Sequence, residues 1–230
     1  MPARAAVLVA LMLAAGCTQD TADPSLTAPT PPTTPLSTPI PTSTSGRITD
    51  TQTVADLLTY HQNAVGGSSA RRPDIIARWE LPIPLFVDAS ASATNVRQAM
   101  EYWRSVTGLT YVMLTADVEP RIFVRAGTDG LGTAGARGLV DGTYADNRAR
   151  SGLVVVRPDL ALCDFAQSSC QVIYEHELGH TIGLFDHVAG GGIMSGGTRA
   201  STREINMLLE LYRLPHGTHI DPDGTWRGVP

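Results

Sequence analysis

Lysine is absent from this 230-residue chain, so arginine supplies all 17 basic side chains. The 22 acidic residues outnumber them and give a formal net charge of −5, and no basic run occurs. Nucleic acids are bound through clustered positive charge, so this composition argues against nucleic acid as a partner. Cysteine is also scarce, at three residues. None lies between Cys17 and Cys163.

The N-terminal residues are typical of a secretion signal and not of a folded domain. One arginine precedes an apolar run from Ala5 to Ala15, which is shorter than the roughly 20 residues of a membrane-spanning helix. The run leads into Leu-Ala-Ala-Gly-Cys, ending at Cys17, which resembles a bacterial lipobox. We therefore expect residues 1–16 to be a lipoprotein signal peptide and Cys17 to carry the lipid. An ordinary signal with a chance cysteine is the alternative.

The segment after Cys17 is dominated by threonine, proline and serine up to Ser45. Such a composition cannot bury a core and stays extended in solvent. Residues 17–46 are therefore predicted to be the lipid-anchor cysteine and a linker, which would hold the rest of the chain away from a membrane. Residues 47–230 suit one globular domain. We expect it outside the cytoplasm, either on a bacterial membrane lipoprotein or secreted.

The other two cysteines, Cys163 and Cys170, are close in sequence. Outside the cytoplasm such a pair favours a disulfide over a metal site. A bridge there would fix the start of the helix that follows.

The motif that organises the domain is His176-Glu177-Leu178-Gly179-His180. On a helix, residues four apart lie on one face, so His176 and His180 could bind one Zn²⁺. Glu177 would lie beside the metal, where a base that deprotonates water belongs. Considered by itself, this five-residue motif is not decisive, because a helix can also carry two histidines four apart for packing and without a metal.

Further residues extend this motif. Gly183 lets the chain leave the helix through a left-handed residue and turn back towards the metal. Asp186 and His187 follow, and either could supply a third ligand. Met194 then lies in a turn flanked by glycines.

The full pattern, H-E-x-x-H-x-x-G-x-x-D followed by a methionine turn, resembles the metzincin clan of zinc peptidases. Aspartate in place of the usual third histidine, followed by His and later by Met-Ser-Gly-Gly, is similar to snapalysin-type bacterial proteases. The spacing elsewhere is similar to bacterial matrixin-like proteins. The resemblance covers Arg78 to Leu214, and its specific motifs are confined to His176 to Gly197.

The resemblance implies a zinc site in which His176, His180 and Asp186 are the ligands. The third ligand of the clan lies ten residues after the first, which is Asp186 here, and His187 is the alternative. The resemblance also implies that Met194 forms a hydrophobic floor beneath the zinc and is not a ligand.

The fold class that we expect is α+β and zincin-like, with a twisted mixed sheet, a backing helix, a zinc-site helix and a C-terminal helix. The sheet is predicted to be mostly parallel, with a central strand from Gly152 and an edge strand from Leu139. His61 is expected at a surface or interface, and the tail that carries His216 and His219 is expected to be a loop. The predicted helices are Thr49–Val65, Ala93–Thr107, Ser168–Ile182 and Ser201–Leu214, and the predicted strands are Trp79–Asp88, Leu109–Leu114, Arg121–Arg125, Leu139–Tyr144 and Gly152–Arg157.

The predicted function is hydrolysis of peptide bonds by a zinc-dependent endopeptidase, with Glu177 as general base. Its partners would be a peptide or protein substrate and, through the lipid, a membrane, and we expect a monomer. One alternative is a lipid-anchored binding or adhesion protein whose structural zinc site is closed by both Asp186 and His187. Another is an amidase that acts on cell-wall peptides.

Overall fold

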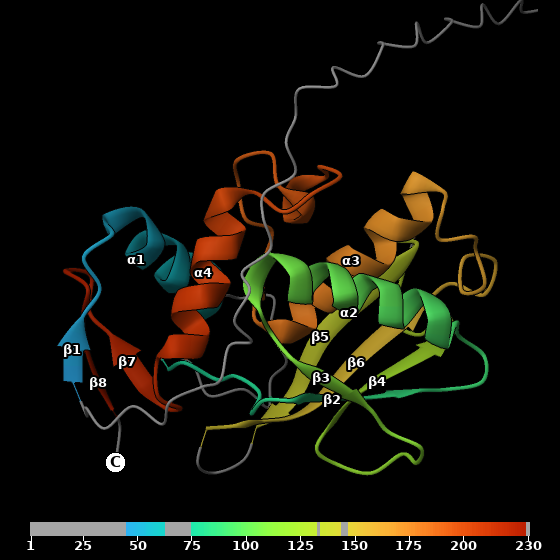
Figure 1. The fold of residues 1–230 in the computed structure, drawn as a ribbon, viewed down its shortest axis with the longest axis horizontal. Coiled ribbons are helices and arrows are strands. Elements are labelled where there is room, and N and C mark those ends of the chain that lie inside the picture. Colours follow the sequence, from blue (N-terminus) through green and yellow to red (C-terminus); the bar gives the residue numbers. More distant parts are fainter. Residues whose placement is uncertain (1–44, 63–74, 133, 144–146, 229–230) are drawn as a thin grey trace, which may run out of the picture. The chain divides into compact units, whose positions relative to one another are not determined.

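The computed structural model describes residues 45–62, 75–132, 134–143 and 147–228 (Figure 1). The signal peptide, the lipid-anchor residue Cys17 and all but the end of the predicted linker lie outside these ranges. Within them, no helix combines the length and the apolar character that crossing a membrane requires.

A mixed five-stranded sheet forms the base of the fold, with strand order β3-β2-β4-β6-β5. Neighbours from β3 to β6 pair in parallel, and β5 pairs antiparallel with β6. The predicted mixed, mostly parallel sheet is therefore confirmed. Among the described strands, β5 is an edge and β6 is internal. The strands are β2 (Ile83–Val87), β3 (Tyr111–Met113), β4 (Arg121–Ala126), β5 (Ala136–Thr143) and β6 (Ala149–Val156).

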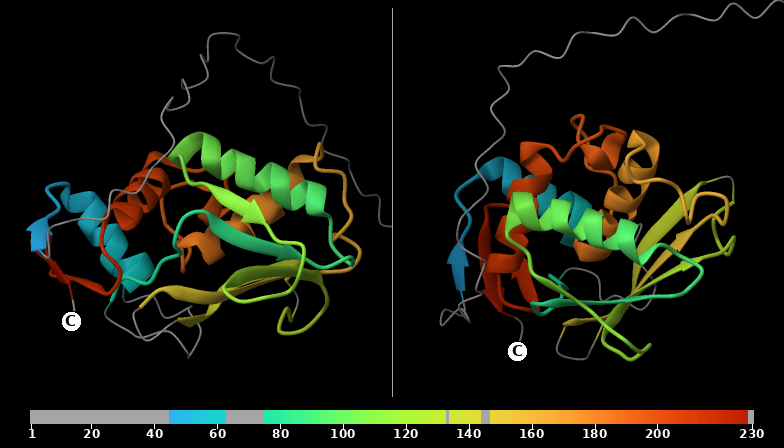
Figure 2. Two further views of the ribbon diagram at one scale, coloured as in Figure 1. Left: turned by 60° about the horizontal axis from the view of Figure 1, so that its bottom comes forward. Right: turned by 45° about the vertical axis from the view of Figure 1, so that its right-hand side comes forward.

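Two helices cover the same face of this sheet, α2 (Ala93–Thr107) and α3 (Ser168–Ile182) (Figure 2). Both have the bounds that the sequence predicts. The side chain of Ser92 caps α2 by accepting from the backbone N–H of Asn95, and Gly108 ends it with a φ of 77°. Alternate residues of the strands point towards these helices, because side chains alternate between the faces of a sheet.

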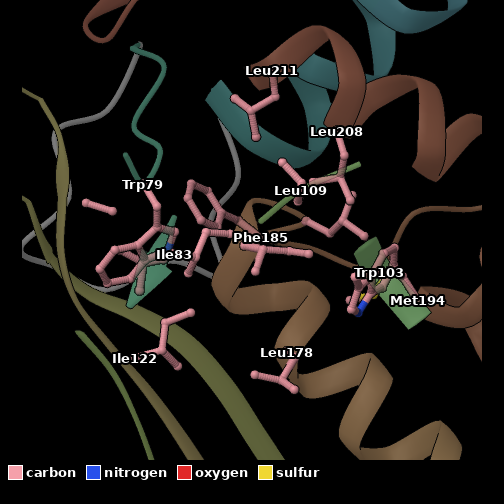
Figure 3. Close-up of a cluster of buried hydrophobic side chains, with 14 of the residues drawn as sticks. Trp79, Ile83, Trp103, Leu109, Ile122, Leu178, Phe185, Met194, Leu208 and Leu211 are labelled. Carbon is pink, nitrogen blue, oxygen red and sulfur yellow. The ribbon is translucent and has the colours of Figure 1, made fainter. Parts of the chain in front are cut away.

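The hydrophobic core lies between the sheet and the helices and continues towards the C-terminal helix. Figure 3 shows its central part, to which strands, helices and the chain after α3 all contribute. The labelled core residues are Trp79, Ile83, Trp103, Leu109, Ile122, Leu178, Phe185, Met194, Leu208 and Leu211.

Three aromatic side chains from different parts of the chain fix α3 through hydrogen bonds to its backbone. The indole of Trp103 donates to the carbonyl of Glu175 at 2.8 Å. Trp79 and Tyr212 donate to the carbonyls of Thr181 and Ile182, at 2.7 and 3.0 Å. Carbonyls at a helix end lack partners within the helix. The bonds to Thr181 and Ile182 therefore satisfy two such carbonyls and hold the end of α3 in place.

The disulfide Cys163–Cys170 is formed, with a Cα–Cα distance of 5.9 Å. It joins the preceding loop to the first turn of α3, as predicted. Asn95 on α2 donates to the carbonyl of Cys163 at 2.8 Å, so the same loop is also tied to α2. A disulfide is consistent with a location outside the cytoplasm.

The first and last described segments fold together. The α-helix α1 (Thr51–Leu57) continues as a π-helical turn, η1 (Leu58–Gln62), and packs against α4 (Thr202–Arg213). The predicted first helix thus begins two residues later than expected, and its last three residues lie outside the described ranges. Strands β1 (Ser45–Arg47), β8 (Thr225–Gly228) and β7 (Thr218–Ile220) form a second, antiparallel sheet.

Two expectations for these segments are wrong in part. The C-terminal tail is a turn at His216, as expected, but His219 lies in β7, and β8 follows. The sequence did not predict this pairing because its partner β1 lies about 180 residues earlier, as in the pair Gly46 and Trp226. His61 is not at the surface, because its side chain is fully buried.

Candidate metal centre

Three histidine side chains converge at one end of the cleft beside β5. His176 and His180 project from α3 one turn apart, and His187 comes from the chain after that helix. Their ligand atoms all lie within 4.8 Å of one another. The ring of His187 is 5.2 Å from each of the other two rings, between centroids. Three imidazoles at this spacing form a nitrogen-rich donor set of the kind that zinc prefers.

The hydrogen bonds of the two helical histidines fix which ring nitrogen is available. Nδ1 of His176 lies 2.9 Å from the carbonyl of Ile193, and Nδ1 of His180 lies 2.7 Å from that of Leu184. A carbonyl only accepts, so each Nδ1 must carry the proton. Each Nε2 therefore keeps its lone pair for a metal, which is how metal-binding histidines are usually oriented.

Burial keeps both imidazoles neutral. It lowers the pKa of His176, and it lowers the pKa of His180 to about 4, with a further contribution from the neighbouring His176. A metal therefore meets unprotonated rings at neutral pH, without having to displace protons.

Asp186 lies outside this cluster of three histidines. Its Oδ1 accepts a hydrogen bond of 2.7 Å from the backbone N–H of His187. The structure therefore brings His176, His180 and His187 together, whereas the carboxylate of Asp186 accepts a hydrogen bond within its own turn.

The turn that delivers His187 begins at Gly183. This glycine has a φ of 136°, which side-chain-bearing residues rarely adopt, so the predicted positive φ is present. A Cβ here would lie 2.3 Å from Cδ2 of Leu211, so packing against α4 also requires glycine. The N–H of Leu184 bonds to the carbonyl of Gly179 at 3.0 Å and closes the turn.

Glu177 lies next to the histidines and is nearly buried, at 9% exposed. Burial raises the pKa of its carboxyl to about 7, and the backbone N–H of Gly138 opposes this shift by donating to it. A carboxylate with a pKa near the working pH is suited to proton transfer. The predicted base therefore lies between the edge strand β5 and the histidine cluster.

Gly138 lets β5 approach α3 at Glu177. A Cβ on Gly138 would lie 2.0 Å from the backbone oxygen of Glu177. The sequence analysis did not predict this contact, since nothing in the sequence places residue 138 against residue 177. A cleft of about 430 Å³ opens beside this contact, lined by Ala134, Gly135, Ala136, Arg137, Gly138, Ile173, His176, Glu177, His180 and His187.

Met194 lies in the short 3₁₀ turn η2 (Ile193–Ser195). It is buried beside Trp103 (Figure 3). A Cβ on Gly179 would lie 2.8 Å from its sulfur and 3.1 Å from the indole of Trp103. The glycine inside the histidine motif therefore makes room for the methionine.

Glu204 holds this turn in place, a role that the sequence analysis did not assign. Its carboxylate accepts from the backbone N–H groups of Ile193 and Met194, at 3.2 and 2.8 Å. It also completes a capping box with Ser201 at the start of α4. Because Ile193 in turn accepts from His176, the carboxylate is linked through one residue to a histidine of the cluster.

No protein-family model matches the chain, and no curated protein matches its sequence. A solved structure that does match is high choriolytic enzyme 1, a hatching enzyme zinc-protease from medaka fish (Oryzias latipes). The sequence identity is 19% and the TM-score is 0.28. The match covers 53% of this chain and 50% of that enzyme, so the chain spans about half of its length. A likeness this low carries no argument about function.

Proposed function

We propose that the protein is a zinc-dependent endopeptidase of the metzincin type that acts outside the cytoplasm. The observation that carries this proposal is the convergence of His176, His180 and His187 beside a buried glutamate, at a cleft bordered by an edge strand. The H-E-x-x-H-x-x-G pattern and the buried methionine turn support the same assignment.

Three protein ligands suit a catalytic site better than a structural one. Structural zinc is usually closed by four protein ligands, whereas catalytic zinc keeps a position for water or substrate. We propose His187 as the third ligand, with Asp186 as the alternative. If both bound, the site would be closed, and the alternative of a binding or adhesion protein with structural zinc would be favoured.

Each residue of the site has a role in this mechanism. When bound by the three histidines, Zn²⁺ would polarise the scissile carbonyl and lower the pKa of a water molecule. Glu177 would take the proton from that water and pass it to the leaving amine. The Nδ1 hydrogen bonds of His176 and His180 keep both rings oriented for this work.

The edge strand β5 supports a peptide as the substrate. An extended peptide can add to a free sheet edge through backbone hydrogen bonds, independently of its sequence. A peptide paired with β5 would pass Gly138, which contacts Glu177 beside the cleft. The scissile bond would then lie between the general base and the metal. An amidase that acts on cell-wall peptides would use the same chemistry, and only a substrate screen separates the two.

The test is the variant Glu177→Gln in a peptide-library digest with metal analysis. We expect it to keep stoichiometric zinc and to lose turnover by at least about 10²-fold, the low end for a missing general base. Glu175→Gln is the matched control, because it alters the preceding buried carboxylate, which contacts Gln171 and Arg199 and does not line the cleft. Turnover by Glu177→Gln at the level of this control would rule out the mechanism. Wild-type protein that binds zinc but cleaves no peptide would favour the binding protein.

A further inference from the structure

The chain that carries His187 contacts a distant part of the molecule on both sides of that residue. We call residues 183–189 the metal-site loop. Its first residue, Gly183, offers its carbonyl to Nδ1 of His61 at 2.8 Å. Its last, Ala189, donates its N–H to the hydroxyl of Tyr60 at 3.3 Å. His61 and Tyr60 are neighbours in η1, so one turn of the N-terminal segment holds both ends of the loop.

His61 is held in this contact by one face and both nitrogens of its ring. Nδ1 must donate, because its partner is a carbonyl, and Nε2 accepts from the N–H of Ala77 at 3.3 Å. The ring stacks on Phe185 of the loop, with centroids 4.3 Å apart and planes at 20°. Phe185 itself points into the core (Figure 3). The imidazole is therefore neutral, fully buried and held from several directions.

The hydrogen bond from His61 to Gly183 lies one residue away from the hydrogen bond that orients the ring of His180. The carbonyl of Gly183 accepts from His61, and the next carbonyl, that of Leu184, accepts from Nδ1 of His180. His187 is exposed and depends on the loop for its position. A shift of the loop would thus move His187 and release the ring of His180.

The N-terminal segment is in turn anchored away from the loop. Asp56 on α1 pairs with Arg203 on α4, with Oδ2 and Nε 3.1 Å apart. Gln62 exchanges two hydrogen bonds with the backbone of Ile220 in β7, at 3.0 and 2.8 Å. Strand β1 pairs with β8. The segment therefore has a fixed position from which to hold the loop.

We propose that the segment Ser45–Gln62 is a working part of the metal site and not a removable prosegment, and that His61 is a positioning residue for the metal-site loop. The inference rests on the proposed zinc site. It holds whether His187 or Asp186 is the third ligand, because both lie on this loop. His61 contacts Gly183 and Phe185 of the loop, and we propose that it acts through them.

The experiment measures zinc affinity by competition with a chromophoric chelator, together with the visible spectrum of the Co²⁺ form. All variants are made in the full chain and compared at a temperature where far-UV circular dichroism finds each folded. His61→Phe keeps a ring to stack on Phe185 but has no donor for Gly183. His61→Asn keeps a donor but loses the ring. Thr107→Val is the matched control, because it removes two buried hydrogen bonds at the end of α2, to the carbonyl of Trp103 and from the N–H of Leu109, and touches neither the N-terminal segment nor the loop.

We expect His61→Phe to weaken zinc binding roughly 10-fold, the low end for groups that orient metal ligands. It should also alter the Co²⁺ spectrum, and His61→Asn should recover part of the affinity. Thr107→Val should lower the stability but bind zinc like the wild type. Wild-type affinity in His61→Phe, or equal losses in His61→Phe and Thr107→Val, would overturn the inference and leave the proposed function intact. A wild-type protein without metal affinity would overturn both.

Discussion

The buried carboxylate of Glu204 accepts a hydrogen bond of 2.8 Å from the backbone N–H of Met194, ten residues earlier in the chain. The same carboxylate accepts from the N–H groups of Ile193 and Ser201. Three backbone donors that depend on one buried side chain make that residue difficult to replace. Hydrogen bonds to charged groups contribute more than neutral ones, and a buried donor without a partner carries a desolvation cost.

The first prediction is that Glu204→Gln destabilises the domain. The amide can accept through one atom only, and its NH₂ group would face a backbone N–H. We expect the free energy of unfolding to fall by about 1.5–3 kcal/mol, the range for a hydrogen bond to a charged group. Guanidinium denaturation of the metal-free protein measures it.

Glu210→Gln on the same helix is the control for that measurement. Glu210 pairs with the exposed Arg213 one turn away, and surface pairs of this kind contribute about 0–1 kcal/mol. Equal effects of the two substitutions would show that the buried carboxylate has no special role.

Elements with local signals were predictable from the sequence. The helix α2 has its predicted bounds because apolar spacing, a capping serine and a glycine stop signal lie within or beside it, and α3 ends at the glycine that the sequence marks as its stop. The positive φ of Gly183 follows from the same local reasoning. The disulfide could be proposed because its two cysteines are close in sequence.

What the sequence could not supply was contact between distant segments. The burial of His61 depends on Gly183 and Phe185, more than a hundred residues away. The capping box at Ser201 predicts a local role for Glu204 but not its bonds to the turn at Met194. The choice between Asp186 and His187 depends on how a short turn directs adjacent side chains, and clan spacing alone favours the aspartate.

A second prediction concerns the contact between β5 and α3. In Gly138→Ala the new methyl group would lie 2.0 Å from the backbone oxygen of Glu177, and no side-chain rotation relieves a clash with backbone. The strand must move away from the helix, so we expect loss of peptide hydrolysis and a destabilisation of about 1–3 kcal/mol, as in other overpacked sites. Thermal unfolding and a peptide-cleavage assay measure the two effects.

Gly135→Ala, which alters another glycine that lines the same cleft, serves as the control for Gly138→Ala. Its Cβ would meet only the end of the Leu160 side chain, at 3.0 Å, and that side chain can turn aside. The two variants should therefore differ clearly. Similar activity and similar melting temperatures would mean that β5 need not touch α3 at Glu177.

A third prediction concerns the bridge between Cys163 and Cys170. This bridge closes a short loop before α3. When it is reduced, the unfolded chain gains conformational entropy, because that loop is no longer closed. We expect reduction to lower the free energy of unfolding by roughly 2–3 kcal/mol, on the chain-entropy account of so small a loop. Guanidinium unfolding with and without reductant measures this. The double variant Cys163→Ala, Cys170→Ala should not respond to reductant, and an equal response in both proteins would exclude the bridge as its cause.

The last prediction decides the third ligand. The ring of His187 lies 5.2 Å from the rings of both His176 and His180, between centroids. One carboxylate oxygen of Asp186, in contrast, already accepts a hydrogen bond from the backbone N–H of His187. Removal of a ligand should weaken zinc binding more than removal of a residue that shapes the ligand's turn. We therefore expect His187→Ala to weaken zinc affinity by more than roughly 100-fold, beyond the range for outer-shell partners, and Asp186→Ala by about 10-fold.

Zinc titrations of these two variants measure the difference, and Asp186→Asn is the control that keeps an acceptor for the N–H of His187. The opposite order of affinities would give the ligand role to Asp186, the choice that the metzincin spacing favours. Equally severe losses in both variants would mean that both side chains bind and that the metal has four protein ligands. Because such a site leaves no position for water, that result would also remove the main support for an enzyme and favour a binding protein with structural zinc.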